Sequence, residues 1–372
     1  MMVRMDLRTV RSATLALVLL LSCAAATAAS LHIVFINPGR ADEPFWRSVT
    51  RFMQPAAQQL DIELEVLYAD RDHVQMANLA RAVTERREKP DYLILVNEKR
   101  AAGDMLKLAE KAGIKTMLAF SAFEGSQAAE FGEPRQQYPH WVGAITPNSR
   151  EAGELSAQEL VRQAFKAGRA DHAGKVHVAL VAGDKATPTS VQRTDGALAA
   201  LAANPTVVVE QIVYAGWERE RAKQNVHSLL QLYPGLGAIW CASDLMAYGG
   251  MDAARALGQH PGKDVLFSAF NNSHEVLHKV VDGQIAALAG GHFTMGAWAL
   301  VMLYDYHHGS DFAPLGLQSR PAVFSLIDAG MAQRFLARFV TEDFTTVDFR
   351  QYSRHLHPQL KRYDFSLATL LN

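Results

Sequence analysis

The sequence predicts an α/β protein in which helices cover both faces of parallel sheets. From Leu31 to about Gly309, short apolar segments alternate with segments whose apolar residues recur at helical spacing. The short segments are almost continuously hydrophobic, which is typical of strands buried on both faces of a parallel sheet. There are too many of these units for one small open sheet. The pattern therefore allows two similar doubly wound domains or one eight-fold β/α barrel.

In the first half of the chain, strands and helices are predicted in turn. The predicted strands are residues 31–37, 62–69, 91–97, 114–120 and 140–146, and the predicted helices are residues 45–60, 75–89 and 101–113. The helix from Phe45 to Leu60 has apolar residues at helical spacing along its length. The helix after the third strand ends at Gly113, a residue suited to a helix C-terminus.

After residues 140–146 the alternation starts again. The predicted strands are residues 175–183, 206–216, 237–244, 264–270 and 285–291, and the predicted helices are residues 148–168, 190–205, 218–234, 272–284 and 294–309. Asn148 is followed three residues later by Glu151, a pairing typical of a capped helix start.

Residues 1–29 have a different composition. Arginines in MMVRMDLRTVRSA precede the apolar run TLALVLLLSCAAA, and the small residues of ATAAS follow. This layout is typical of a secretory signal peptide, whose apolar run is too short to span a bilayer comfortably. Cys23 after LLS also resembles a lipoprotein cleavage box, which would tether the protein to a membrane. We expect the soluble exported form, with lipid anchoring through Cys23 as the alternative.

Composition excludes several classes of protein. The chain has 372 residues, of which 49% are hydrophobic and 20% charged, and its formal net charge is −1. This balance favours a globular protein and gives no electrostatic footprint for nucleic acid. After cleavage the soluble form keeps only Cys241, so no internal disulfide is expected and this cysteine is expected to be buried and inert.

Two large aromatic residues stand side by side at the start of the first predicted helix. In the stretch DEPFWRSV, Pro44 precedes Phe45 and Trp46. Neighbours on a helix point about 100° apart, so these two rings cannot both lie in one core-facing stripe. One of them is therefore surplus to the core.

Polar residues follow most of the apolar strands. They are Asn37, Asn97, Glu98, Ser121, Thr146, Asp184, Ser243, Asp244, Asn271, Asn272 and His292. Open parallel sheets bind ligands beyond the carboxyl ends of their strands. Nearly all of these residues can hydrogen-bond and few are charged, so the sequence predicts a rim suited to a neutral polyhydroxylated ligand.

Six motifs in order carry a resemblance to a known family. They are DEPFW at the first helix, VN at the end of the third strand, VGAITPNSREAGELSAQEL, VQRTDG, GAIWCASDLMAYGGMDAARALG and VLFSAFNNS. In this order and spacing, the chain from Leu31 to about Asp328 resembles the sugar-type periplasmic binding proteins of the ribose and galactose receptor class.

The resemblance implies two doubly wound parallel-sheet domains joined by a three-segment hinge, the type 1 periplasmic binding protein fold. The N-terminal lobe would comprise residues 30–145 and 291–322, and the C-terminal lobe residues 146–290 and 323–340. The chain would cross between lobes near 144–146, 290–292 and 320–324. Residues 341–372 would be an extension that packs on a lobe or docks a partner; we favour packing, because buried aromatic residues stabilise.

The resemblance also implies ligand-binding residues in the cleft. They are Glu43, Phe45, Trp46, Asn97, Ser121, Arg193, Ser243, Asn271 and His292. The two aromatic residues match positions that stack on sugar rings, and Arg193 matches an arginine whose fork donates to neighbouring oxygens. Without the resemblance, an aromatic pair is more often part of the core, and an arginine in a helix more often solvated.

Three positions depart from the sugar-receptor pattern. Phe120-Ser121 stands where an Asp-Arg pair is common, Asn271 stands in place of an aspartate, and Ser243 in place of an asparagine. The site then lacks the carboxylates that hold common aldoses, and Glu43 is the candidate to supply one instead. The first and third departures make the site more similar to periplasmic autoinducer-2 receptors, which signal through a membrane kinase.

Motifs of catalysis and cofactor binding are absent from the sequence. It contains no GxGxxG after a strand, no GxxxxGK[ST], no HExxH and no GxSxG. His307-His308 and His355/His357 have no third ligand nearby and read as surface residues. Asp244 reads first as a helix N-cap, and Cys241 has no base partner. We expect no catalytic residue, no metal and no cofactor, and keep a hydrolase as the weaker alternative.

The expected protein is thus a monomeric periplasmic receptor that captures a small sugar-like ligand and delivers it to an ABC transporter permease. The alternative is a sensor that signals through a membrane kinase or cyclase. The autoinducer-receptor-like site and the long C-terminal extension favour sensing, because a permanent partner needs extra surface. A repressor with the same core fold is excluded by the signal peptide in place of a DNA-binding helix-turn-helix.

Overall fold

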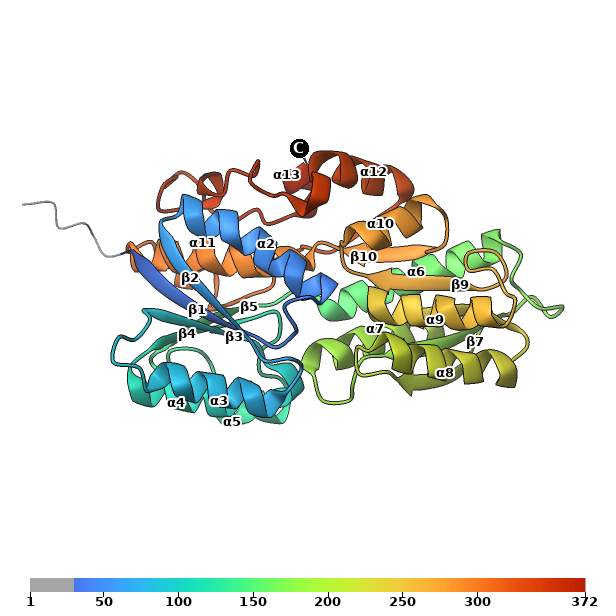
Figure 1. Cartoon of the computed structure of the whole chain (residues 1–372), viewed down its shortest axis with the longest axis horizontal. Helices are drawn as coiled ribbons and strands as arrows, with labels where there is room; N and C mark the ends of the chain where they lie inside the picture. Colours follow the sequence, from blue (N-terminus) through green and yellow to red (C-terminus); the bar gives the residue numbers. More distant parts are fainter. Residues whose placement is uncertain (1–29, 372) are drawn as a thin grey trace, which may run out of the picture.

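The computed structural model describes residues 30–371 as two six-stranded sheets with helices on both faces (Figure 1). The first sheet has the order β11-β5-β4-β3-β1-β2, with β1 (Leu31–Asn37), β2 (Ile62–Tyr68), β3 (Tyr92–Leu95), β4 (Lys115–Ala119), β5 (Trp141–Ile145) and β11 (Gln318–Ser319). The second has the order β12-β10-β9-β8-β6-β7, with β6 (Val176–Ala182), β7 (Val207–Tyr214), β8 (Leu236–Cys241), β9 (Leu266–Phe270), β10 (Ala287–Gly290) and β12 (Ser325–Leu326). Among the strands of the described residues, only β12 pairs antiparallel, with β10. The predicted pair of doubly wound sheets is confirmed, and the single barrel is excluded.

Helices pack in pairs on the faces of the two sheets. Those on the first sheet are α2 (Pro44–Gln59), α3 (His73–Thr84), α4 (Ala102–Ala112), α5 (Ser126–Phe131) and α11 (Met295–His307). Those on the second are α6 (Ser149–Lys166), α7 (Pro188–Ala202), α8 (Arg219–Leu232), α9 (Asp244–Ala256) and α10 (His274–Val281). We call the first sheet with its helices the first lobe and the second sheet with its helices the second lobe.

Helix starts and ends follow local chemistry. Asn148 caps α6 by accepting a hydrogen bond from the backbone N–H of Glu151 at 3.3 Å, which confirms the predicted cap. Pro44 occupies the first turn of α2, where its missing N–H costs nothing. Helix α3 ends at Thr84 rather than at the predicted residue 89, because its last buried apolar residue is Val83.

The chain passes from one sheet to the other after β5, after β10 and between β11 and β12. These passages lie close to the three crossings that the resemblance implied. The exact lobe boundaries stay a prediction.

The C-terminal strap, residues 341–371, lies over the first lobe after α12 (Ala329–Arg338) has packed on α10 (Figure 1). The side-chain amide of Gln59 on α2 donates to Val347 O and accepts from Phe349 N, both at 2.7 Å. Phe344 and Phe349 are buried and meet the ring of Phe52 edge-on at 5.1 and 5.0 Å. The strap ends in α13 (Leu367–Leu371), which contacts α12.

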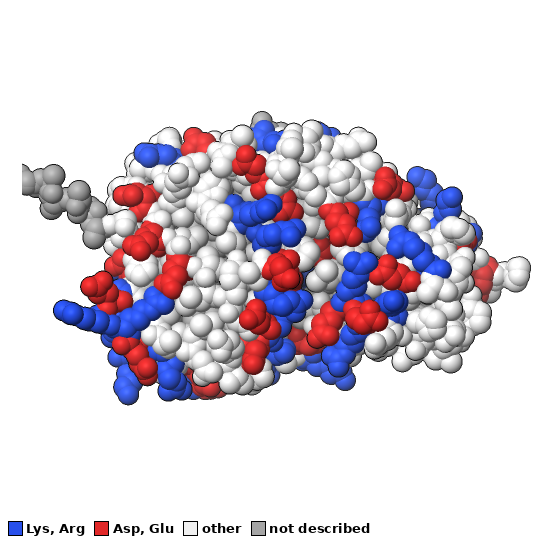
Figure 2. Space-filling view, in the orientation of Figure 1, with Lys and Arg blue, Asp and Glu red and all other residues white. Residues whose placement is uncertain are grey.

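Charged side chains of both signs are interspersed over the molecular face shown in Figure 2. This mixture agrees with the small net charge of the chain. Within residues 30–371, no helix is long and apolar enough to cross a bilayer, and no group of three His, Cys, Asp or Glu side chains is placed to hold a metal. The predicted signal peptide and Cys23 lie outside the described residues. Cys241 is fully buried, and burial raises the pKa of its thiol.

Candidate functional site

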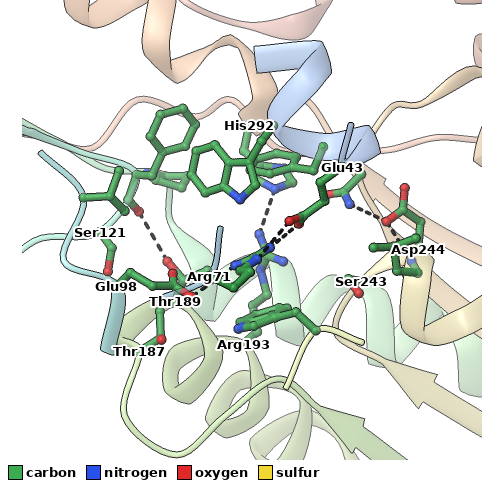
Figure 3. Close-up of a pocket in the computed structure, with 18 residues that line it drawn as sticks. Glu43, Arg71, Glu98, Ser121, Thr187, Thr189, Arg193, Ser243, Asp244 and His292 are labelled. Atoms are coloured by element: carbon green, nitrogen blue, oxygen red, sulfur yellow. Dashed lines mark hydrogen bonds and ion pairs between the residues drawn. The ribbon is translucent and has the colours of Figure 1, made fainter. Parts of the chain in front are cut away.

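A cavity lies between the lobes, where strand ends of both sheets meet (Figure 3). The predicted site residues that line it are Glu43, Phe45, Trp46, Ser121, Arg193, Ser243, Asn271 and His292. Residues that sequence reasoning did not assign to the site but that also line it are Arg71, Val96, Glu98, Phe120, Pro147, Thr187, Thr189, Trp217, Asp244 and Leu245. The expectation that ligands bind beyond the carboxyl ends of the strands and the family resemblance together named 8 of these 18 lining residues as site residues.

Asn97 does not line the cavity. Its side-chain amide donates to Ala122 O at 3.0 Å and to the side chain of Gln127 at 2.8 Å, and its oxygen accepts from the N–H of Ala102 at 3.1 Å. The side chain is fully buried and ties the end of β3 to the segment after β4. In this arrangement its hydrogen-bonding groups are used within the protein.

Phe45 and Trp46 both line the cavity, in different ways. Trp46 is buried, meets Phe120 edge-on at 5.1 Å between ring centroids, and lies so close to Gly39 that a Cβ there has no room. Phe45 is half-buried and stacks on His292 at 4.7 Å with an interplanar angle of 23°. The indole nitrogen is the one polar side-chain atom of Trp46, and its N–H is buried with no hydrogen-bond partner.

Arg193 and His292 form a buried pair in which the tautomer can be assigned. Arg193 Nη2 lies 2.9 Å from His292 Nε2, and Nη1 donates to Ala242 O at 2.9 Å. A guanidinium can only donate, so Nε2 accepts and the imidazole proton sits on Nδ1. That Nδ1–H and Arg193 Nε–H are both buried without partners. The pair therefore offers two unused donors.

Within residues 30–371, no carboxylate lies within ion-pair distance of Arg193. Its guanidinium lies 4.4 Å from the ring centroid of Phe270 and 5.6 Å from that of Phe324. Burial lowers the pKa of Arg193 to about 9 and, together with the positive charge of Arg193, lowers the pKa of His292 well below its ordinary value. At neutral pH the arginine is charged and the histidine neutral.

Asp244 is not the N-cap of α9, which corrects the sequence-based interpretation. Ser243 caps the helix by accepting from Met246 N at 3.3 Å, and Asp244 is the first helical residue. Its buried carboxylate accepts from Asn271 Nδ2 at 2.6 Å and from Ser273 Oγ at 3.1 Å. Burial outweighs these bonds and raises the pKa of Asp244 to about 6.

The cavity carries more charge than the sequence predicted. Arg71, which follows β2, donates from Nε to Glu43 at 3.0 Å and from Nη1 to Glu98 at 3.1 Å, and Nη2 also contacts Glu43. Both glutamates are buried. Burial raises the pKa of Glu98, and the ion pair with Arg71 opposes that rise. Glu43, the expected source of a carboxylate, lines the cavity, and Glu98 and Asp244 line the same space.

Two lining residues were missed because the residues that follow two of the strands were not considered, although ligands are expected beyond the carboxyl end of every strand. Arg71 follows β2 and Trp217 follows β7, the two strands omitted from the predicted rim. Both have positive φ, 65° and 67°, and this left-handed conformation turns the chain at the strand end. Glu98 and Asp244 were in the rim but were not carried into the site.

Both lobes contact each other around the cavity. The backbone N–H of Lys99 in the first lobe donates to Thr187 Oγ1 of the second at 3.1 Å. Thr189 Oγ1 of the second lobe donates to Phe120 O of the first at 3.3 Å. The cavity is therefore enclosed from both sides.

The lining provides hydrogen-bond donors, acceptors and aromatic rings. Among the lining residues, Ser243 Oγ accepts from a backbone N–H and Ser121 Oγ has no partner. The accepting nitrogen of His292 faces Arg193, so it activates neither hydroxyl. This arrangement suits recognition of a small polar molecule.

The profile of a family described as periplasmic binding protein domain matches residues 33–311. A solved structure of a periplasmic sugar-binding protein from Pseudomonas fluorescens superposes with a TM-score of 0.83 at 38% identity, covering 92% of this chain and 100% of that one.

Two further relatives are more distant. The D-ribose/D-allose-binding protein of Pseudomonas aeruginosa is 26% identical over 194 residues, 52% of this chain and 54% of its own length, so the match spans about half of that relative. An ABC transporter periplasmic solute-binding protein from Actinobacillus succinogenes, solved with bound D-allose, has a TM-score of 0.70 at 20% identity, covering 81% of this chain and 99% of that one. At this identity the likeness shows the fold alone.

Proposed function

The chain belongs to the periplasmic binding protein family, and we propose that it captures a small sugar-like ligand between its lobes and passes it unaltered to an ABC transporter. One observation carries this proposal. Four buried polar atoms without partners belong to residues that line one cavity: Trp46 Nε1, Ser121 Oγ, Arg193 Nε and His292 Nδ1. Buried polar groups are nearly always satisfied, so such a concentration marks the place of an absent partner.

Aromatic rings define the shape of the proposed partner. Phe45, Trp46 and Trp217 present ring faces or edges to the cavity, and a sugar ring has apolar C–H faces with hydroxyls at its edge. We propose that these rings cover the faces of the ligand while Arg193, His292, Ser121 and the carboxylates bind its hydroxyls. Relatives described as sugar-binding proteins, or solved with a bound sugar, support this assignment.

Closure of the lobes would couple binding to transport. Lining residues come from both lobes, so a ligand that touches both stabilises the closed form. We propose that the three segments between the sheets act as the hinge. The closed form then presents a surface to the permease that the open form lacks. We place the protein in the periplasm, exported by residues 1–29.

Transport is favoured over sensing by the packing of the strap. The long C-terminal extension was one of two reasons to consider a signalling partner, but its aromatic residues Phe344, Phe349 and Phe365 are buried against the protein itself. They are thus not available as a docking surface. The relatives described as ABC transporter proteins support the same choice.

Binding can be tested with a panel of aldoses, polyols and furanoses. A ligand specific to the folded protein raises its melting temperature by mass action, so we expect a shift with at least one compound at millimolar concentration. Isothermal titration gives the Kd, and mass spectrometry of the recovered compound should show it unaltered. Arg193→Met should lose the shift, and Arg162→Met, which changes an exposed ion pair with Glu159, should keep it. No shift with any compound would contradict the proposal, and turnover would overturn the non-catalytic assignment.

A further inference from the structure

Three charged residues from three strand–helix connections form one cluster at the cavity. Glu43 precedes α2, Arg71 follows β2 and Glu98 follows β3. The guanidinium of Arg71 lies between the two carboxylates, with the contacts of 3.0 and 3.1 Å described above (Figure 3). The cavity is lined by two arginines, Arg71 and Arg193. Among the described residues, Arg71 forms ion pairs with carboxylates and Arg193 forms none.

The backbone fixes where Arg71 stands. Its N–H donates to Pro38 O at 2.8 Å, and the N–H of Asp70 donates to Gly39 O at 3.1 Å. Both carbonyls belong to the loop that leads into Glu43, so the arginine and its carboxylate partner are held to the same framework. The guanidinium also lies 6.0 Å from the ring of Trp46 and 5.9 Å from that of Trp217 in the other lobe. Arg71 is thus oriented by both lobes in this closed arrangement.

The cluster has the hydrogen-bonding character that hydroxyl groups need. A guanidinium has five N–H groups, and Arg71 uses three of them on the glutamates, which leaves two as donors. Each carboxylate keeps lone pairs beyond those that Arg71 engages. A ligand hydroxyl both donates and accepts, so neighbouring hydroxyls can bind a carboxylate and the guanidinium together. Burial of the two glutamates strengthens such bonds.

Charge distinguishes an uncharged ligand from an acidic one. Three carboxyl groups line the cavity, Glu43, Glu98 and Asp244, against the two guanidiniums of Arg71 and Arg193. An acidic group on the ligand would meet this excess in a site of low dielectric, where like charges repel strongly. The two guanidiniums would attract it, but Arg71 already pairs with two carboxylates, and Arg193 lies close enough to Asp244 for their charges to interact.

We propose that the Glu43–Arg71–Glu98 cluster determines the specificity of the cavity, selecting an uncharged polyhydroxylated ligand and excluding its acidic derivatives. Arg71 is the positioning residue: it holds both carboxylates as hydrogen-bond acceptors. Sugar receptors often have an Asp-Arg pair at the position of Phe120-Ser121. In this chain the cluster would supply carboxylates and a guanidinium to the cavity from the ends of other strands. The inference rests on the proposed function and deepens it.

The test uses matched neutral and acidic probes. D-galactose is compared with D-galacturonate and D-ribose with D-ribose 5-phosphate, by thermal shift and isothermal titration on the full mature chain. We expect the neutral member of at least one pair to bind at least about tenfold more tightly than its acid. Equal or tighter binding of the acid would overturn the inference and leave the proposed function standing. No binding of any probe or of the wider panel would remove both.

Variants separate positioning from general structure. Arg71→Met leaves two buried carboxylates without their cation and should weaken binding of the neutral probe roughly 100-fold. Arg40→Met removes an exposed arginine of the neighbouring loop and should change nothing. The double variant Glu43→Gln, Glu98→Gln should lower the neutral-to-acid preference at least about tenfold, because the charge excess then becomes positive. An unchanged preference in that variant would contradict the proposal. If Arg71→Met fails to fold, Arg71→Lys retains the charge without the planar fork and should still weaken binding.

Discussion

Two buried polar clusters of this protein are built in opposite ways. In the first, Asp305 of α11 is fully buried and accepts four hydrogen bonds from the strap: from Ser353 Oγ at 2.5 Å, Arg354 N at 2.7 Å, His355 N at 3.1 Å and Tyr363 Oη at 2.8 Å. In the second, the cavity, Arg193, His292, Trp46 and Ser121 each keep a buried atom without a partner. The Asp305 cluster is saturated and the cavity is not.

The difference shows what each cluster is for. A buried polar group without a hydrogen bond costs about 1–3 kcal/mol, whereas a satisfied one is nearly neutral or stabilising. Saturation around Asp305 therefore fastens the strap to the first lobe. By contrast, we propose that the unsatisfied groups in the cavity are kept for a ligand, at a cost to the stability of the free protein. The two clusters should respond differently to substitution.

The largest expected effect is loss of the Asp305 cluster. Asp305→Ala leaves four donors without their acceptor, two of them backbone N–H groups, and should lower the free energy of unfolding by about 4 kcal/mol. Urea denaturation with a fluorescence readout measures it. Asp305→Asn keeps one acceptor oxygen and should lose less. Ligand affinity of the folded fraction should be unchanged, and a loss below about 1 kcal/mol would show that the strap is not fastened there.

A second prediction concerns Asp244, the buried carboxyl of the cavity. Its pKa in the folded protein is about 6, above the ordinary 3.8, so the folded state holds the proton more tightly than the unfolded state does. Its contribution to stability is therefore favourable at low pH and is lost as pH rises from about 4 through 6. Well above pH 6 this contribution of about 3 kcal/mol has been lost.

Asp244→Asn removes this titration. The variant should become more stable relative to the wild type by about 2 kcal/mol between pH 4.5 and pH 7.5. Urea midpoints at the two pH values measure the difference. Buried His292 has a lowered pKa and destabilises both proteins below its ordinary pKa, so its effect cancels in the comparison. A difference that does not vary with pH would show that Asp244 is not titrating in this range.

A third prediction sharpens the contrast between stability and binding. Arg193→Met keeps the packing against Phe270 and removes a buried charge that has no ion-pair partner. Removal of the buried charge offsets the loss of its hydrogen bonds to Ala242 O and His292 Nε2, so the free energy of unfolding should change little, while affinity for the ligand falls by about 2 kcal/mol or more. Urea denaturation and isothermal titration on the same preparation measure both. Loss of stability together with affinity would mean that Arg193 is a structural residue.

The sequence predicted the fold because its strands are buried on both faces. A run such as LHIVFIN, residues 31–37, has six of its seven residues buried. Burial on both faces of a parallel sheet is enough to explain why nearly all of its residues are hydrophobic. The strand-end rule then located Ser121, Ser243, Asn271 and His292 at one cavity. The fold and the position of these residues both follow from the order of strands and helices, and the order of the apolar segments in the sequence predicts that order.

Other features depend on contacts that sequence spacing does not contain. Asn97 and Glu98 are neighbours, yet the amide turns into the protein and the carboxylate lines the cavity. Asp305 and its strap partners are separated by about 50 residues, and nothing in the pattern around Asp305 distinguishes it from an ordinary helix aspartate. The cluster at Arg71 was missed because charge in a sequence does not show which residues pair.

The smallest expected effect tests the contrast most directly, because it compares two serines with the same defect. Ser121 Oγ and Ser149 Oγ are both buried without a hydrogen-bond partner, but only Ser121 lines the cavity. Neither substitution by alanine removes a hydrogen bond from the free protein, so stability should be unchanged or slightly higher in both. Ser121→Ala should lower ligand affinity by about 1 kcal/mol, roughly fivefold, since one hydroxyl contact to the ligand is lost. Ser149→Ala should leave affinity as it is. Isothermal titration of both variants side by side decides the matter: equal affinities would mean that the unsatisfied hydroxyl of Ser121 is not reserved for the ligand.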